Sequence, residues 1–210
     1  MAQENNYKVE NFDPEVLREY DIRGVVGESI NENTAYTIGR TFGHTVKSKL
    51  TSHTIVTGYD GRLTSPSLHK ALCKGLKDSG VKVINIGMGP TPMTYFAHYH
   101  FDADAAVMLT GSHNPSEYNG FKMVFNKHSF FAEDIQSLQK LLDNNELELA
   151  DGQIINQDIT EEYIERDLLN ISLNRKLKIA WDPGNGAMGK VTRKITEQLI
   201  HSENFIINED

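Results

Sequence analysis

The chain has 210 residues, of which 39% are hydrophobic, and a formal net charge of −8 from 21 basic and 29 acidic side chains. No stripe of Lys or Arg is visible, which argues against a nucleic-acid partner, because affinity for a phosphate backbone is built from clustered cations. Residues 1–6 lack the charged region and apolar core of a signal peptide and no apolar run is long enough to span a membrane, so we expect a cytoplasmic protein with no membrane partner.

Apolar runs and helical stripes alternate along the first part of the chain, as is typical of an α/β sheet protein. The helix predicted at 65–79 has Pro66 in its first turn and Gly80 beyond its end. Cys73, the only cysteine, lies on the apolar stripe of that helix and can form no internal disulfide. The other predicted elements are helices at 35–46 behind a cap at Asn31 or Asn33, at 91–99 and at 133–142, and strands at 54–57, 81–86, 105–109 and 121–125.

The last part of the chain has a weaker and shorter pattern. Residues 143–152 are polar enough to begin a connection, and we place a domain boundary around Asn156. The sequence then predicts a helix at 160–170, a strand at 177–181, a glycine turn, a helix at 190–200 and a strand at 204–208. A piece of this size with two strands buries little surface. We therefore expect it to be the beginning of a second domain.

Ser112 is the side chain most strongly suggested as reactive. It follows the apolar run 105–109, and it stands in a polar turn that contains Gly111 and the Asn114-Pro115 pair and closes at 119–120. A serine at such a place can simply cap the turn. A serine hydrolase is a second alternative, but His113 is adjacent in sequence and is expected to point away, whereas a nucleophile and its base usually meet across the fold.

Four segments resemble motifs of the α-D-phosphohexomutases, the superfamily of phosphoglucomutases and phosphomannomutases. The serine turn with the following Asn119-Gly-Phe-Lys122 is most similar to the bacterial phosphomannomutase/phosphoglucomutase branch. The resemblance implies a three-layer α/β/α mixed-sheet domain with a phosphoserine loop over residues 1–155, and part of a second similar domain over 156–210. The four segments, in the order of the family, are Tyr20-Asp-Ile-Arg-Gly24, Gly58-Tyr-Asp-Gly-Arg62, 110–123 and Asp182-Pro-Gly-Asn-Gly186.

The resemblance also implies a reaction, namely the interconversion of hexose 1-phosphate and hexose 6-phosphate through a phosphate carried by Ser112, with a hexose 1,6-bisphosphate as intermediate and activator. A seryl phosphate carries about −1.5 to −2 charges, so cations must offset it. Mg²⁺ would take one oxygen of this phosphate, and the family's three-aspartate metal loop is not among these 210 residues. The implied roles are phosphate contact for Arg23, acid/base help or charge stabilisation for Lys122, substrate contact or proton transfer for His113, and substrate binding for Tyr20 and Asn114.

Two alternatives remain open from the sequence. The chain is expected to be an N-terminal portion that is inactive alone, and otherwise a non-catalytic remnant or one half of a split enzyme completed by another polypeptide. The segment Gly184-Asn-Gly-Ala-Met-Gly189 also satisfies a dinucleotide-binding fingerprint, with Glu209 near the usual acidic position. Asp182 at the strand end is expected to repel a diphosphate. Preference among glucose, mannose and glucosamine phosphates is not predicted.

Overall fold

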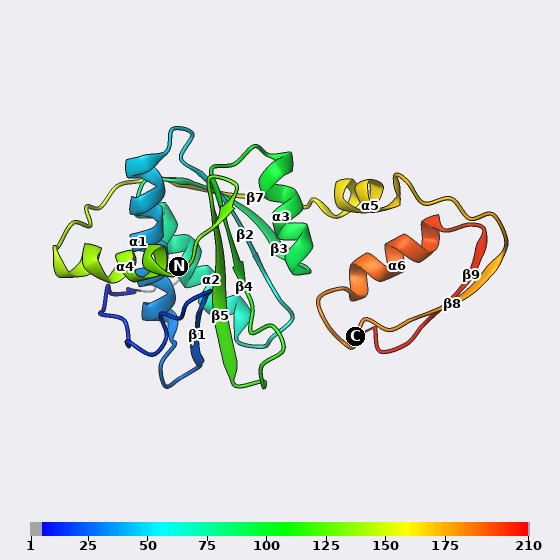
Figure 1. Ribbon diagram of the computed structural model, residues 1–210, viewed down its shortest axis with the longest axis horizontal. Helices are drawn as coiled ribbons and strands as arrows, with labels where there is room; N and C mark the ends of the chain where they lie inside the picture. Colours follow the sequence, from blue (N-terminus) through cyan, green and yellow to red (C-terminus); the bar gives the residue numbers. More distant parts are fainter. Residues whose placement is uncertain (1–5, 210) are drawn as a thin grey trace, which may run out of the picture.

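A seven-stranded mixed sheet organises most of the computed structural model, which describes residues 6–209 (Figure 1). The strand order is β1-β5-β4-β2-β3-β7, and β6 pairs with β5. Strands β4, β2, β3 and β7 are parallel, whereas β5 runs antiparallel to β4, β1 and β6. The strands are β1 (Ile22–Val25), β2 (Thr54–Tyr59), β3 (Lys82–Met88), β4 (Ala105–Leu109), β5 (Tyr118–Phe125), β6 (His128–Ser129) and β7 (Gln153–Asn156).

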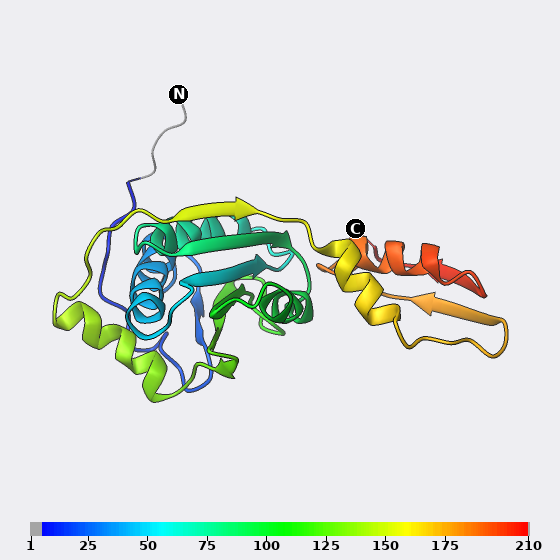
Figure 2. The same ribbon diagram turned by 90° about the horizontal axis from the view of Figure 1, so that it is seen from above.

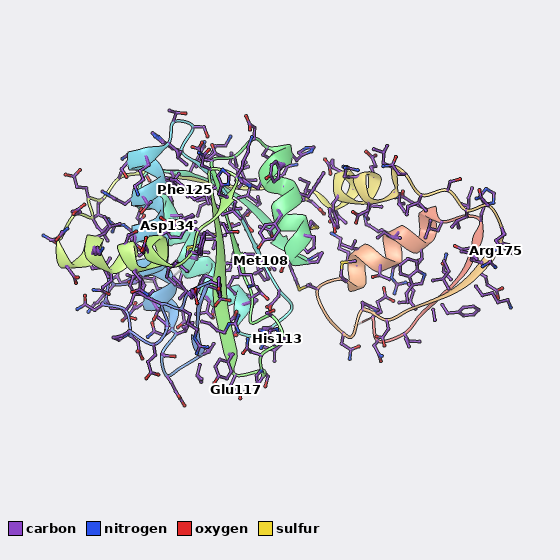
Figure 3. All side chains as sticks on the ribbon, in the orientation of Figure 1. Met108, His113, Glu117, Phe125, Asp134 and Arg175 are labelled. Atoms are coloured by element: carbon purple, nitrogen blue, oxygen red, sulfur yellow. The ribbon has the colours of Figure 1, made fainter. Side chains whose placement is uncertain are left out.

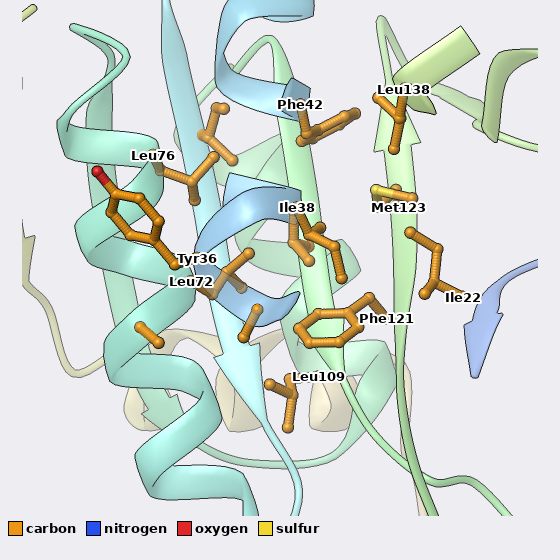
Figure 4. Packing of buried hydrophobic residues seen from close by; sticks show 14 of the residues in the cluster. Ile22, Tyr36, Ile38, Phe42, Leu72, Leu76, Leu109, Phe121, Met123 and Leu138 are labelled. Carbon is orange, nitrogen blue, oxygen red and sulfur yellow. The ribbon is translucent and has the colours of Figure 1, made fainter. Parts of the chain in front are cut away.

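Helices cover both faces of this sheet (Figure 2). Helices α1 (Glu32–Lys49), α2 (Ser65–Lys77) and α4 (Glu133–Asp143) lie on one face, and α3 (Thr91–His100) lies on the other. Successive residues of a strand therefore face different helical layers. Ile55 packs in the cluster that contains Ile38 of α1 and Leu72 of α2 (Figure 4), whereas Val56 packs with side chains of α3. The predicted mixed sheet with helices on both faces is confirmed.

Most of the expected elements occur within one to three residues of their predicted bounds. Asn31 caps α1, because its side chain accepts from the backbone N–H groups of Asn33 and Thr34. Strand β4 has the predicted bounds. The turn signal at 119–120 is overridden, however, since these residues lie inside β5, where Gly120 pairs with Arg23 of β1.

Strands β1, β6 and β7 were not predicted. Strand β1 has four residues, one of them Arg23, so its alternation of apolar residues is too short to detect. Strand β6 has only two residues, both exposed. Strand β7 is an exposed edge strand that begins with Gln153 and ends with Asn156, within the segment where we expected a connection. These strands form because a neighbouring strand supplies their hydrogen-bond partners, which the sequence of the strand itself does not encode.

The segment after β7 forms a small unit of its own beyond α3 (Figure 1). Its strands make a parallel two-stranded sheet, with β9 starting two residues earlier than predicted. The unit packs on the first sheet's α3 layer, where the rings of Phe96 and Tyr163 lie 5.6 Å apart. Its elements are α5 (Thr160–Leu168), β8 (Leu177–Trp181), α6 (Gly189–Gln198) and β9 (Ser202–Ile206).

The sequence also led us to expect no membrane-spanning segment and no signal peptide. Within residues 6–209, no helix has the length and apolar character that crossing a membrane would require. The expectation that residues 1–6 form no signal peptide falls mainly on residues 1–5, which lie outside the described part of the chain.

Candidate active site

Ser112 lies on an exposed loop at the carboxyl end of β4. Figure 3 shows its neighbour His113 and the loop residue Glu117 at the end of the sheet opposite Phe125. The backbone of Ser112 is left-handed, with φ of 53°. Few non-glycine residues adopt this conformation, and it is enriched where function over-determines the backbone. Ser112 is exposed, as the sequence predicted.

The expectation that His113 points away from Ser112 is wrong. Its Nδ1 lies 3.3 Å from Ser112 Oγ. The reason is that Ser112 and His113 lie in a turn and not in a strand, where successive side chains would point to opposite faces. Among the described residues no carboxylate hydrogen-bonds to His113, so the third member of a serine-hydrolase triad is not found there.

Asp60, which follows β2, anchors the start of this loop. Its Oδ2 accepts from Thr110 Oγ1 at 2.9 Å and from the backbone N–H of Gly111 at 3.1 Å. Its Oδ1 accepts from Ser65 Oγ at 2.6 Å. The hydroxyl of Thr110 in turn accepts from the Ser112 backbone N–H at 2.9 Å. A chain of hydrogen bonds therefore runs from the N-terminus of α2 through Asp60 to Ser112.

The two cations expected at the site, Arg23 and Lys122, lie on neighbouring strands and share one carboxylate. Asp21 Oδ2 accepts from Arg23 Nη2, and it also pairs with Lys122 Nζ at 3.3 Å. The side chain of Asp21 is only 8% exposed, whereas that of Lys122 is 31% exposed. The structure thus brings both cations together at one buried carboxylate, and the side chain of Lys122 remains partly exposed.

Backbone pairing connects the cations to the serine loop. Arg23 is opposite Gly120 in the β1–β5 ladder, and the carbonyl of Gly120 accepts from Thr110 N–H at 2.9 Å. Arg23, Gly120 and Thr110 therefore lie in one row across neighbouring strands, and Thr110 comes two residues before Ser112. Within residues 6–209, Ser112 Oγ makes no hydrogen bond to either cation, whose carboxylate partner is Asp21.

The remaining expected residues lie on either side of this row. Tyr20 is 71% exposed, and Glu19 hydrogen-bonds its hydroxyl and raises the pKa of Tyr20. With Lys122 it borders a hollow of about 330 Å³ against α3. Asn114 shares the loop of Ser112, where its Nδ2 donates to the Gly111 carbonyl at 2.9 Å. Tyr20 thus borders a hollow beside Lys122, and Asn114 is held within the Ser112 loop.

A groove of about 480 Å³ separates the Ser112 loop from the glycine turn of the second unit. It is lined by Asp60, Arg62 and Ser112 on one side and by residues 183–188 on the other. The side of the groove formed by the loop carries the polar residues Asp60, Arg62 and Ser112. A small polar molecule that entered it would meet Ser112.

The glycine turn does not have the free amides of a diphosphate site. The N–H of Gly186 donates to Pro183 O, and that of Gly189 donates to Gly186 O. Asp182, which was expected to repel a diphosphate, accepts at Oδ1 from the neutral donors Gly184 N–H at 2.9 Å and Asn208 Nδ2 at 3.1 Å. The turn is closed on itself by these bonds, and a dinucleotide would find its donors occupied.

Three residues of the site received no role from the sequence, namely Asp21, Asp60 and Arg62. All three stand in the quoted motifs 20–24 and 58–62. The signal that could have found them is an acid placed directly at a strand end beside a cation in each motif. The hydrogen-bond and ion-pair partners of these three residues could not be predicted from the sequence.

The described residues do not form a metal site by themselves. No group of three or more His, Cys, Asp or Glu side chains in residues 6–209 is arranged to hold a metal ion. Asp60, the carboxylate closest to Ser112 in the hydrogen-bond chain, already accepts from Thr110, Gly111 and Ser65. Mg²⁺ prefers near-octahedral oxygen ligands, and this part of the chain does not gather them.

Residues 14–148 match the family described as phosphoglucomutase/phosphomannomutase, alpha/beta/alpha domain I. A phosphomannomutase/phosphoglucomutase of Pseudomonas putida is 42% identical over 88% of this chain and 40% of its own length. A phosphoglucomutase of Neisseria meningitidis is 39% identical over 90% of this chain and 41% of its own length.

The solved structures agree with the sequence relatives. A phosphoglucomutase/phosphomannomutase family protein from Burkholderia thailandensis superposes with a TM-score of 0.87 at 35% identity, over 95% of this chain and 45% of that one. The chain spans about 40% of the length of the curated relatives it matches.

Proposed function

The chain belongs to the phosphoglucomutase/phosphomannomutase family, and from this premise we propose that it carries the phosphoserine site of a phosphohexose mutase. The reaction proposed is the intramolecular phosphotransfer that interconverts hexose 1-phosphate and hexose 6-phosphate. The observation that carries the proposal is the exposed, left-handed Ser112 at the groove, with a cation pair on the adjoining strands. Because the chain spans about 40% of its relatives' length, the complete reaction and its phosphohexose substrate are proposals for the whole protein.

The proposed chemistry is phosphoryl transfer in two directions. Phosphorylated Ser112 loses its group as the Oγ–P bond breaks and a P–O bond to a sugar hydroxyl forms, while the proton of that hydroxyl leaves and Oγ gains one. The resulting hexose 1,6-bisphosphate returns its other phosphate to Oγ by the reverse step. Phosphate monoesters react very slowly unaided, so positioning and charge stabilisation must supply the acceleration.

The site residues divide these tasks. We assign Arg23 to contact with the transferring phosphate, and Lys122 to charge stabilisation or acid/base help. His113 is the best-placed proton carrier, since its Nδ1 lies 3.3 Å from Ser112 Oγ. Tyr20 and Asn114 are assigned to binding of the substrate.

Magnesium is proposed to contact this chain only through an oxygen of the phosphate on Ser112. The described residues offer it no ligand cluster, so no step of the mechanism passes through it here. The same fact supports the proposal that this chain turns over little substrate alone. A split enzyme, in which a second polypeptide supplies the ligands, is the alternative that an added partner would reveal.

Covalent labelling tests the proposal on the chain itself. The chain is incubated with glucose 1,6-bisphosphate and its intact mass is measured, before and after phosphatase treatment. We expect the mass of one phosphate to appear on the unmodified chain and to be absent from Ser112→Ala. Ser116→Ala is the matched control, because Ser116 is exposed on the same loop and should leave the labelling unchanged. A phosphate that survives Ser112→Ala contradicts the proposal, because another residue would then carry it.

A further inference from the structure

We propose that Arg62 is a positioning residue whose guanidinium holds the carbonyl side of the Ser112 loop and does not itself bind the phosphate. The inference rests on the proposed function, because it concerns how Ser112 is presented for phosphoryl transfer. Arg62 follows β2, fifty residues from Ser112 along the chain, and none of the roles expected from the sequence falls on it.

The guanidinium of Arg62 is surrounded by backbone carbonyl oxygens of the loop. Nη1 donates to the carbonyl of Pro115 at 2.6 Å and to that of Tyr118 at 3.0 Å. Nη2 donates to the carbonyl of Asn114 at 2.7 Å and to that of Ser112 at 3.2 Å. One side chain thus ties four peptide groups between Ser112 and the start of β5 to a single point.

Asp60 fixes the orientation of the planar Arg62 guanidinium, which binds the carbonyls like a fork. Arg62 Nε lies 3.3 Å from Asp60 Oδ2, and the Arg62 backbone N–H donates to Asp60 Oδ1 at 3.1 Å. Because Asp60 also accepts from the N–H of Gly111, the pair grips the loop at both its amide and its carbonyl side. Gly111 makes room for this: a Cβ there would lie 2.3 Å from the guanidinium carbon.

The hydrogen-bond capacity of Arg62 is filled by these contacts. A guanidinium has five N–H donors, and here two pairs point at carbonyls and the fifth faces Asp60. A phosphate could reach Arg62 only by displacing one of them. This separates Arg62 from Arg23, to which we assign the phosphate contact.

The positive charge of Arg62 also compensates the partial negative charge of the loop carbonyls. Carbonyl oxygens that converge under Ser112 repel a phosphate of about −1.5 to −2 charges. The positive guanidinium offsets the negative ends of these carbonyls and so reduces that repulsion. In addition, the left-handed φ of Ser112 is a conformation that surrounding contacts must maintain. Arg62 supplies four of those contacts through one planar group.

The first arm of the test measures the loop without relying on activity. Hydrogen–deuterium exchange is followed in the full chain for the unmodified protein, Arg62→Lys and Arg62→Ala. We expect faster exchange in peptides covering 111–120 for both variants, because lysine cannot form the planar fork. Peptides from α1 report whether the rest of the fold is intact. Arg166→Ala, at an exposed arginine of α5, is the matched control and should change neither region.

The second arm measures uptake of phosphate from glucose 1,6-bisphosphate by intact mass over time. A loosened loop should slow labelling about 100-fold in both variants. Added guanidinium ion should restore part of the rate of Arg62→Ala, whereas methylammonium should not. This rescue separates the geometry of the fork from a general loss of stability.

The outcomes distinguish this inference from the proposed function. If the phosphate survives Ser112→Ala, the proposed function fails, and the exchange arm still decides the role of Arg62. Unchanged exchange in 111–120 overturns the inference. So does slow labelling of Arg62→Ala that is corrected simply by more bisphosphate, since that would identify Arg62 as a phosphate-binding residue.

Discussion

At the scale of single residues, Asp21 is the carboxylate on which the two proposed catalytic cations depend. It is buried and pairs with both Arg23 and Lys122. Two cations held this close would repel each other without it. Asp21 therefore fixes their separation before any phosphate arrives, which lowers the reorganisation that a transition state would require.

His69 provides a residue-scale prediction about pH. It lies on α2 beside Tyr59, with ring centroids 4.8 Å apart, and its Nε2 is 3.5 Å from Cys73 Sγ. Burial lowers the pKa of His69 from 6.5 to about 4, because the charged ring would lose its water. Burial also raises the pKa of the Cys73 thiol to about 12, so this cluster is neutral and unreactive.

The direction in which stability changes with pH follows from proton uptake by His69. Between pH 6.5 and about 4 the unfolded chain binds a proton at His69 and the folded chain does not, so stability is present above pH 6.5 and is lost as the pH falls. At roughly 1.4 kcal/mol per unit, urea unfolding at pH 7.5 and pH 5.0 should show the unmodified chain losing about 2 kcal/mol more than His69→Gln. His128→Gln, at an exposed histidine, should keep the full loss. Equal pH slopes for the unmodified chain and His69→Gln would contradict the assignment.

At the scale of elements, helices α1 and α2 approach each other at two glycines. A Cβ at Gly75 would lie 2.2 Å from the Tyr36 carbonyl oxygen, and one at Gly39 would lie 2.4 Å from that of Leu72. The helices can only be this close because neither residue has a side chain. Their contact places Ile38, Phe42 and Leu76 over the sheet (Figure 4).

Gly75→Ala should therefore destabilise the protein, although alanine is the better helix former by about 1 kcal/mol. The added methyl group meets backbone rather than a movable side chain, and overpacking of this kind costs about 1–3 kcal/mol. We expect a net fall of at least about 1 kcal/mol in the free energy of unfolding, measured with urea. Lys70→Ala, on the exposed face of α2, should stay within about 0.5 kcal/mol. A stabilised Gly75→Ala variant would mean that the helices are not so close.

At the scale of the whole molecule, one apolar cluster joins the two parts of the chain. Met93 and Ala97 of α3 pack with Ile159 and Ile164, so the second unit covers the outer side of the α3 layer. The same docking holds the glycine turn across the groove from Ser112. The shape of the groove thus depends on the apolar contact between α3 and the second unit, which lies outside the groove.

Ile164→Asp should detach the second unit, because a carboxylate would be buried at a fully covered position. We expect faster hydrogen exchange over 157–209 and in α3, with β2 and β4 still protected. Ile171→Asp is the control, since Ile171 is 55% exposed and its change should leave exchange as it was. Loss of protection in β2 as well would show instead that the two parts unfold together.

The sequence by itself determined the features that short stretches encode. The apolar run 105–109, the helical stripes and the turn residues around Ser112 fixed β4, the helices and an exposed hydroxyl, because periodicity and backbone preference act locally. The motifs at 20–24, 58–62 and 110–123 identified the family.

Only the tertiary structure decided which groups are partners. Lys122 meets Asp21 across 101 residues, and Arg62 reaches the carbonyl of Ser112 across fifty. Strands β1 and β7 likewise exist because β5 and β3 pair with them. Hydrogen bonds and ion pairs between distant segments depend on how the layers pack, and no local pattern of residues specifies that packing.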